Sequence, residues 1–162
     1  MRNISSVRHF VVLAFTFTTA MLGAQLASAH GEATGIVLER HTLMTELRDA
    51  NKIISAMASG KQTLERDVLA MNAETMSKLA SRMAGLFPDT TASRRGAGSS
   101  TRQTAWREFA RFSSIADELT NQAAALADKA DSATREQLAD RARALGNACK
   151  QCHKSYRHKK KH

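Results

Sequence analysis

The feature that most constrains this chain is the run Cys149-Lys150-Gln151-Cys152-His153, near the C-terminal end of the sequence. Two thiols separated by two residues and followed directly by an imidazole form the attachment signature of a c-type haem. The two sulfurs add to vinyl groups on one edge of the porphyrin, and the histidine ligates the iron. On a helix the three residues share one face, because they are spaced i, i+3 and i+4. The motif therefore predicts one haem c, attached covalently through Cys149 and Cys152, with His153 as the proximal iron ligand.

Two other interpretations of the cysteine pair are weaker. A thioredoxin-like redox pair belongs in a βαβ context, and a structural zinc site needs about four ligands. The sequence shows neither pattern. Cys149 and Cys152 are the only 2 cysteines, so a chain that uses both for haem has no disulfide. Stability must then come from a packed core that includes the cofactor.

The N-terminal segment has the pattern of a secretory signal peptide. The first nine residues carry two arginines and no acid, residues 10–24 are apolar, and Ala27-Ser28-Ala29 fits the small-residue rule for signal peptidase. We expect residues 1–29 to be cleaved and residues 30–162 to form one domain. An uncleaved membrane anchor is the alternative, but the apolar run is short for a span. Export to the periplasm suits a c-type haem, because bacteria attach it outside the cytoplasmic membrane.

The rest of the chain has a helical pattern. It is rich in Ala, Leu, Met, Arg, Lys and Glu, it has a single proline, and no window alternates with period two. Met71 and Phe109 are among the residues predicted to face inward, and residues 90–100 are predicted to form a flexible polar loop. The apolar periodicity predicts an all-α fold with helices at residues 34–59, 63–85, 104–127 and 132–156.

Four amphipathic helices joined by two short turns and one longer loop predict an antiparallel up-down-up-down bundle. In this topology the start of the first helix, the loop between the second and third, and the end of the fourth lie at the same end. His153 is near the end of the fourth helix. The haem pocket is therefore expected at this end, with Phe87 and Trp106 as candidate walls.

The ligand in the sixth coordination position of the iron decides between functions. His41 and Met44 are the candidates, because they are spaced i and i+3 on the inward stripe of the first helix. A thioether ligand raises the reduction potential relative to a nitrogen donor. Position alone leaves other interpretations open. Met44 is also a typical core methionine, and His41 a typical capping or surface-edge residue.

The run from Gly146 to Arg157 resembles the haem motif of the class II cytochromes c, the cytochrome c-prime family of four-helix haem proteins. This family carries the motif near the C-terminus. Weaker similarities occur in the family's order: Arg40–Met44, Gly60, Leu86-Phe87-Pro88 and Ala105-Trp106.

The resemblance implies how the iron is ligated. High-spin cytochromes c-prime have a bulky apolar residue over a five-coordinate iron, whereas low-spin c-556 proteins have a methionine ligand there. Counted from Arg40, that position is Met44, so the resemblance implies the c-556 type with Met44 as the distal ligand. It also suggests that Arg157 lies beside the proximal His153. The alternative for Arg157 is an ordinary cation favoured at a helix C-terminus.

The main functional prediction is a periplasmic one-electron carrier with a His/Met-ligated haem, and not an enzyme. The alternative is a cytochrome c-prime-like haem protein whose five-coordinate iron binds NO or CO. A small haem enzyme such as a peroxidase is disfavoured, because no distal acid–base pair can be placed from the sequence.

The charge balance indicates the kind of partner. Lys and Arg outnumber Asp and Glu by 24 to 15, and +7 remains (22 against 15) without the two leader arginines. Residues 157–162 form a basic tail beside the expected haem edge, which favours redox partners with acidic surfaces. No aromatic residues interleave this tail, as a nucleic-acid stacking surface requires. We expect no nucleic-acid binding, no stable membrane insertion after cleavage, and a monomer or homodimer.

Overall fold

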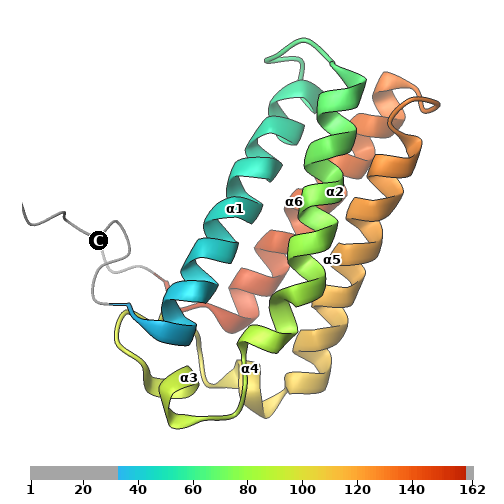
Figure 1. The fold of residues 1–162 in the computed structure, drawn as a ribbon. Coiled ribbons are helices and arrows are strands. Elements are labelled where there is room, and N and C mark those ends of the chain that lie inside the picture. Colours follow the sequence, from blue (N-terminus) through green and yellow to red (C-terminus); the bar gives the residue numbers. More distant parts are fainter. Residues whose placement is uncertain (1–32, 160–162) are drawn as a thin grey trace, which may run out of the picture.

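The computed structural model describes residues 33–159, and the predicted signal peptide lies outside the described residues. Four long helices form an antiparallel bundle, and shorter elements close one end of it (Figure 1). The predicted all-α four-helix fold is confirmed. The elements, in order, are α1 (Gly35–Ala58), α2 (Arg66–Met83), a 3-10 turn η1 (Ala84–Leu86), α3 (Thr91–Arg95), α4 (Thr104–Arg107), α5 (Phe109–Lys129) and α6 (Arg135–Tyr156).

The long helices follow one another around the bundle. α2 packs between α1 and α5, α5 packs against α6, and α6 returns to α1. The start of α1, the short helices α3 and α4, and the end of α6 lie at the same end (Figure 1). This is the arrangement that the up-down-up-down prediction requires. Within residues 33–159, no helix is both long and apolar enough to cross a membrane.

The region between α2 and α5 differs from the prediction. The expected third helix is interrupted at Glu108, whose backbone (φ −113°, ψ 36°) is not helical, and so α4 and α5 are separate. The expected flexible loop contains α3, which begins with the Thr90 side chain accepting a hydrogen bond from the Ser93 backbone N–H at 3.2 Å. Ser93 is fully buried. Tertiary packing has therefore ordered a segment whose polar composition is typical of a loop.

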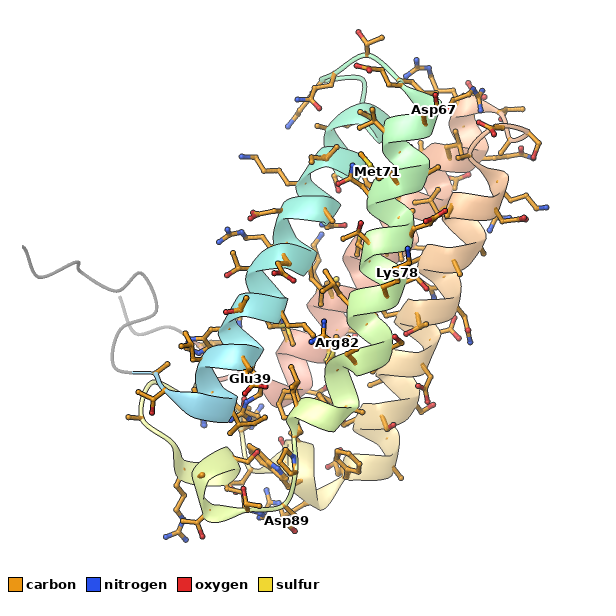
Figure 2. All side chains as sticks on the ribbon, in the orientation of Figure 1. Glu39, Asp67, Met71, Lys78, Arg82 and Asp89 are labelled. Carbon is orange, nitrogen blue, oxygen red and sulfur yellow. The ribbon has the colours of Figure 1, made fainter. Side chains whose placement is uncertain are left out.

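Two residues that were predicted to face inward are exposed. Met71 is 60% exposed, because it follows the buried Leu69 by two residues and so lies roughly 200° around the helix from it. Figure 2 shows Met71 on the same side of α2 as Lys78. Phe109 is 40% exposed, since the break before α5 gives the inward position to Phe112. Other residues of the same predicted stripes, such as Met76 on α2 and Leu119 on α5, are buried, so the error concerns these two residues and not the helices as a whole.

The end of the bundle opposite to α3 and α4 is held by an arginine and a capping box. Arg66 at the start of α2 donates through Nη1 to the carbonyls of Ala130, and of Ala133 at 3.0 Å, in the turn between α5 and α6. Thr134 and Gln137 then start α6 with reciprocal side-chain-to-backbone hydrogen bonds. These contacts satisfy backbone groups that a turn and a helix N-terminus would otherwise leave unpaired.

Residues 96–104, here called the strap, cross the other end of the bundle close to the start of α1. A Cβ atom on Gly96 would lie 2.5 Å from the Ala92 carbonyl oxygen and 2.6 Å from Cγ2 of Val37. Gly98 has φ +73°, and a Cβ atom there would lie 3.1 Å from that of Ala33. The strap can approach α1 this closely only because both residues lack a side chain.

We expect Gly96→Ala to lower the free energy of unfolding by about 1–3 kcal/mol, because the added methyl group must displace backbone or Val37. Chemical denaturation of the purified protein measures this. Gly85→Ala is the matched control, since a Cβ atom there meets no heavy atom within 4 Å. Equal stability of the two variants would mean that the strap is not packed against α1 as described.

Candidate functional site

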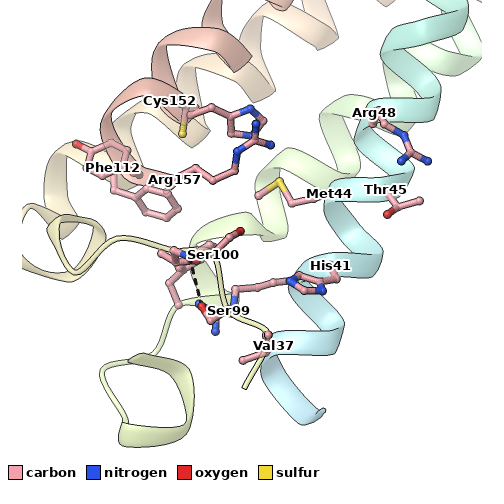
Figure 3. A pocket seen from close by; sticks show the side chains of 16 residues that line it. Val37, His41, Met44, Thr45, Arg48, Ser99, Ser100, Phe112, Cys152 and Arg157 are labelled. Carbon is pink, nitrogen blue, oxygen red and sulfur yellow. Dashed lines mark hydrogen bonds between the residues drawn. The ribbon is translucent and has the colours of Figure 1, made fainter. Parts of the chain in front are cut away.

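The Cys-x-x-Cys-His motif lies in the last two turns of α6 and faces a cavity. This outer cavity has a volume of about 520 Å³ and lies between α1, the strap and the end of α6 (Figure 3). Cys152 and His153 are half-buried and both line it. The volume is in the range of pockets that hold a small molecule or cofactor. All three motif residues are on α6, as predicted.

A second, inner cavity of about 180 Å³ continues from the first toward the middle of the bundle. Side chains from all four long helices line it, and Cys149 is among them. Met44, Arg48, Cys152 and His153 line both cavities. The two spaces therefore adjoin at the line between Met44 on α1 and the motif on α6.

The environment of the motif suits iron ligation and does not suit a redox pair. Burial, with the positive charge of Arg157, lowers the pKa of His153, so the imidazole is neutral at neutral pH, as a metal ligand must be. Burial raises the pKa of Cys149 and raises that of Cys152 to about 11. Reactive redox cysteines need a lowered pKa. Among residues 33–159, no group of three His, Cys, Asp or Glu side chains could hold a metal ion.

Met44 lies opposite the motif. Figure 3 shows its side chain leaving α1 toward Cys152, with the sulfur directed into the outer cavity. His41, one turn earlier on α1, lines the outer cavity but not the inner one. The structure thus brings Met44 to the junction of the two cavities and leaves His41 nearer to the end of the bundle. Whether either side chain ligates iron stays a prediction.

The surroundings of Arg40 indicate whether the residues of the outer cavity fit a haem. It lines the outer cavity and is only 3% exposed, and burial lowers the pKa of its guanidinium. Its Nη2 donates to the Ser93 carbonyl at 2.7 Å, and its guanidinium lies 4.8 Å from the Phe87 ring centroid. Nε and Nη1 are buried and have no hydrogen-bond partner within the described residues 33–159. A buried cation with two free donors calls for an anion, and a carboxylate of a haem fits that requirement.

Arg40 is named in the sequence analysis only as part of the family resemblance, and its position in the wall of the cavity was not predicted. The available signal was positional. Arg40 follows Val37 by three residues on the inward stripe of α1, where a charged side chain has no reason to be unless it has a buried partner.

The aromatic wall of the outer cavity differs in part from the prediction. Phe87, a candidate wall from the sequence, lines the cavity, together with Phe112 and Tyr156, which the sequence did not indicate; whether they contact a haem stays a prediction. The ring centroids of Phe87 and Phe112 are 4.6 Å apart, and those of Phe112 and Tyr156 are 5.4 Å apart. Trp106 lines neither cavity. It packs behind Phe87 at 6.0 Å, where its Nε1 donates to the Pro88 carbonyl at 3.1 Å.

Arg157 combines the two interpretations that the sequence left open. It is the C-cap of α6, and it also lines the outer cavity one turn after His153. The described residues that line the outer cavity include three arginines and no Asp or Glu. The site is therefore suited to a group that carries negative charge.

The chain is a four-helix bundle whose Cys-x-x-Cys-His motif faces a cavity with arginines and aromatic rings in its wall. These features are typical of the class of c-type haem proteins. The model of the family described as Cytochrome C' matches residues 35–157. The chain belongs to the cytochrome c' family, and the predicted covalent haem c is confirmed.

Known relatives agree with this family. A cytochrome c' from Rhodopseudomonas palustris is 27% identical over 143 residues, which cover 86% of this chain and 91% of the relative. A solved structure of cytochrome c' from the same organism has a TM-score of 0.72 at 22% identity, covering 79% of this chain and 99% of the other. One from Alcaligenes xylosoxidans has a TM-score of 0.67 at 20% identity, covering 77% and 94%. These relatives are cytochromes c', and they give no support to the narrower c-556 assignment.

The position of Trp106 behind Phe87 makes its emission a test of the haem location. Trp106 is the only tryptophan of the chain. We expect the emission of the native holo-protein to be nearly absent and to appear on unfolding in denaturant, because a haem in the outer cavity quenches an indole one aromatic layer away. Bright emission from the native protein would place the haem elsewhere.

Proposed function

We propose that this protein is a cytochrome c'-type haem protein whose iron, held by His153 on the proximal side, binds a small gas such as NO or CO on the side of Met44. Haem supplies an iron whose sixth position takes either a protein donor or an exogenous diatomic molecule. In this proposal Cys149 and Cys152 hold the porphyrin, and the Met44 side chain is the distal wall of the gas site.

The inner cavity is the observation that carries this proposal. It is lined by Met44 with Leu47, Ile115 and Leu119 on one side and by Cys149, Cys152 and His153 on the other, so a porphyrin held by the two cysteines would occupy part of it and leave apolar side chains around Met44. Apolar surroundings on the Met44 side of the porphyrin would favour a small uncharged molecule over water at that position. Met44 is unbranched and has three rotatable bonds, so it can change rotamer to admit a diatomic ligand. The solved structures of the Alcaligenes xylosoxidans protein include nitric oxide complexes, which supports the same function here.

One observation favours a second function, that of a one-electron carrier with a His/Met-ligated iron of the c-556 type. Met44 and His153 line both cavities from opposite sides, and the Met44 sulfur is directed into the outer one. A thioether bound to the iron would close the gas site and raise the reduction potential. The two functions differ in whether this sulfur is bound.

Met44→Leu separates them, because leucine keeps the volume and cannot ligate iron. If Met44 is a wall, the variant retains the high-spin spectrum and the carbon monoxide binding of the wild type. Met44→Ala then enlarges the site and speeds carbon monoxide binding, at a cost of about 1–2 kcal/mol of stability, below that of a core truncation because Met44 is half-buried. Absorption spectra of both oxidation states, with and without carbon monoxide, are the measurement.

Met57→Leu is the control, since Met57 is buried on the same helix and lines neither cavity. It should leave the iron spectrum unchanged. A wild-type protein that is low-spin and becomes high-spin only in Met44→Leu would overturn the gas-binding proposal and establish the electron carrier. A low-spin spectrum that survives Met44→Leu would point to another ligand, with His41 the first candidate.

We also propose export to the periplasm and encounter with redox partners that present acidic surfaces. The leader pattern supports export, and the family's covalent haem is consistent with it. The chain carries +7 without the two leader arginines (22 against 15), and the exposed Arg48 and Arg157 place part of this charge around the outer cavity. Such a field accelerates encounter with negatively charged partners.

The rate of electron exchange with a small anionic oxidant such as ferricyanide should fall as ionic strength rises from 0.01 to 0.15 M, because salt screens the attraction over roughly 30 Å and 8 Å respectively. Stopped-flow mixing measures it. A cationic oxidant of similar potential is the control and should show the opposite trend. Identical salt dependence for the two probes would remove the basis for an acidic partner.

A further inference from the structure

The C-terminal end of α6 is capped by a distant part of the chain. A helix leaves its last four carbonyls without intrahelical donors, and in α6 these include the carbonyl of His153 itself. In this structure all four have a donor. The donors are Arg157 N–H to His153 (3.1 Å), Arg102 Nη1 to Lys154 (3.4 Å), Thr104 Oγ1 to Ser155 (3.1 Å) and Arg102 N–H to Tyr156 (2.8 Å).

Three of these four donors come from the strap, about 50 residues away in sequence. The strap also continues past the helix end, where Thr101 and Arg157 form an antiparallel bridge and the His158 N–H donates to the Ser100 carbonyl at 2.8 Å. The first residues of the strap pack against α1, as described for Gly96. Ser99, Ser100 and Thr101 line the outer cavity. The strap therefore connects the two helices that face each other across this cavity.

We propose that the strap, through Arg102 and Thr104, is the element that positions His153 and Arg157 at the iron site. Helix ends open locally far more often than helix middles. His153 is in the last turn of α6, so opening of that turn would move the imidazole directly. Ligand geometry in a metal site depends on outer contacts that fix the ligand's orientation. Arg102 and Thr104 are positioning residues, since they act through the backbone of α6.

Thr104 offers the cleanest test. Its contact with Ser155 is made by the side-chain hydroxyl, so Thr104→Val removes one donor and keeps the volume and the backbone. Thr120→Val is the matched control. Thr120 is also part-buried and its hydroxyl also donates to a carbonyl, that of Ala116 at 2.9 Å, but within α5. Thr104→Ser retains the hydroxyl and should restore wild-type behaviour.

The experiment compares the holo-proteins by amide hydrogen exchange and by electron paramagnetic resonance of the ferric iron. In Thr104→Val we expect exchange of the amides of residues 153–157 to accelerate about fivefold, the factor that loss of one hydrogen bond gives. The ferric signal should broaden or split, because several imidazole orientations are populated. Thr120→Val and Thr104→Ser should match the wild type in both measurements.

Two results would overturn the proposal. Unchanged exchange at residues 153–157 would show that Thr104 does not cap α6. Faster exchange with an unchanged ferric signal would make the strap a structural cap without influence on the iron. The proposal rests on His153 as the iron ligand, but not on the choice between gas binding and electron transfer. The spin state seen in the ferric resonance of the wild type tests the proposed function. The effect of the strap is read from the line shape of that resonance, so the two proposals are tested separately.

Discussion

The end of the bundle that holds the site depends on one buried cation. The Arg40 guanidinium lies over Phe87, donates to the Ser93 carbonyl, and so ties α1 to α3 and to the aromatic wall. Burying a charge costs several kcal/mol unless it is paired, and two donor atoms of Arg40, Nε and Nη1, have no hydrogen-bond partner among residues 33–159. The described part of the chain therefore leaves a buried positive charge that needs an anionic partner. A haem carboxylate would pair with the buried Arg40 guanidinium, so the cofactor would stabilise this end of the bundle as well as occupy the cavity.

The sequence predicted this architecture well because its main signals are local. A 3.6-residue period, one proline and a polar segment gave four helices, and their antiparallel order placed the motif at the end with Phe87. The errors have physical causes. Met71 was assigned to the inward stripe although it lies far around α2 from the buried Leu69, and Phe109 lies at the start of α5, where the break at Glu108 leaves it exposed. The interruption at Glu108 and the order of the strap depend on contacts with α1 and α6 that no local window contains.

The candidate site was predicted to a smaller extent than the fold. Cys149, Cys152 and His153 could be named because the chemistry of attachment fixes their spacing. Three residues of the cavity lie on different helices and come together only when α1, α5 and α6 pack: Arg40, Phe112 and Tyr156. No local sequence pattern therefore predicts that they share a site. Gas binding and electron transfer differ in whether the sulfur of Met44 is bound to the iron. The same fold accommodates both arrangements, so the fold does not decide the function.

The contacts at the two ends of α6 have a consequence for how this molecule comes apart. The capping box at Thr134 starts the helix, and the strap closes it beyond Tyr156. Because both ends of α6 are capped, unwinding from its ends is disfavoured, and thermal opening should begin elsewhere. The turn at residues 59–63 is exposed throughout and lies at the end of the bundle away from the cavity. Heating should therefore loosen the α1–α2 turn first, while the segment that carries the cofactor remains the last cooperative unit to melt.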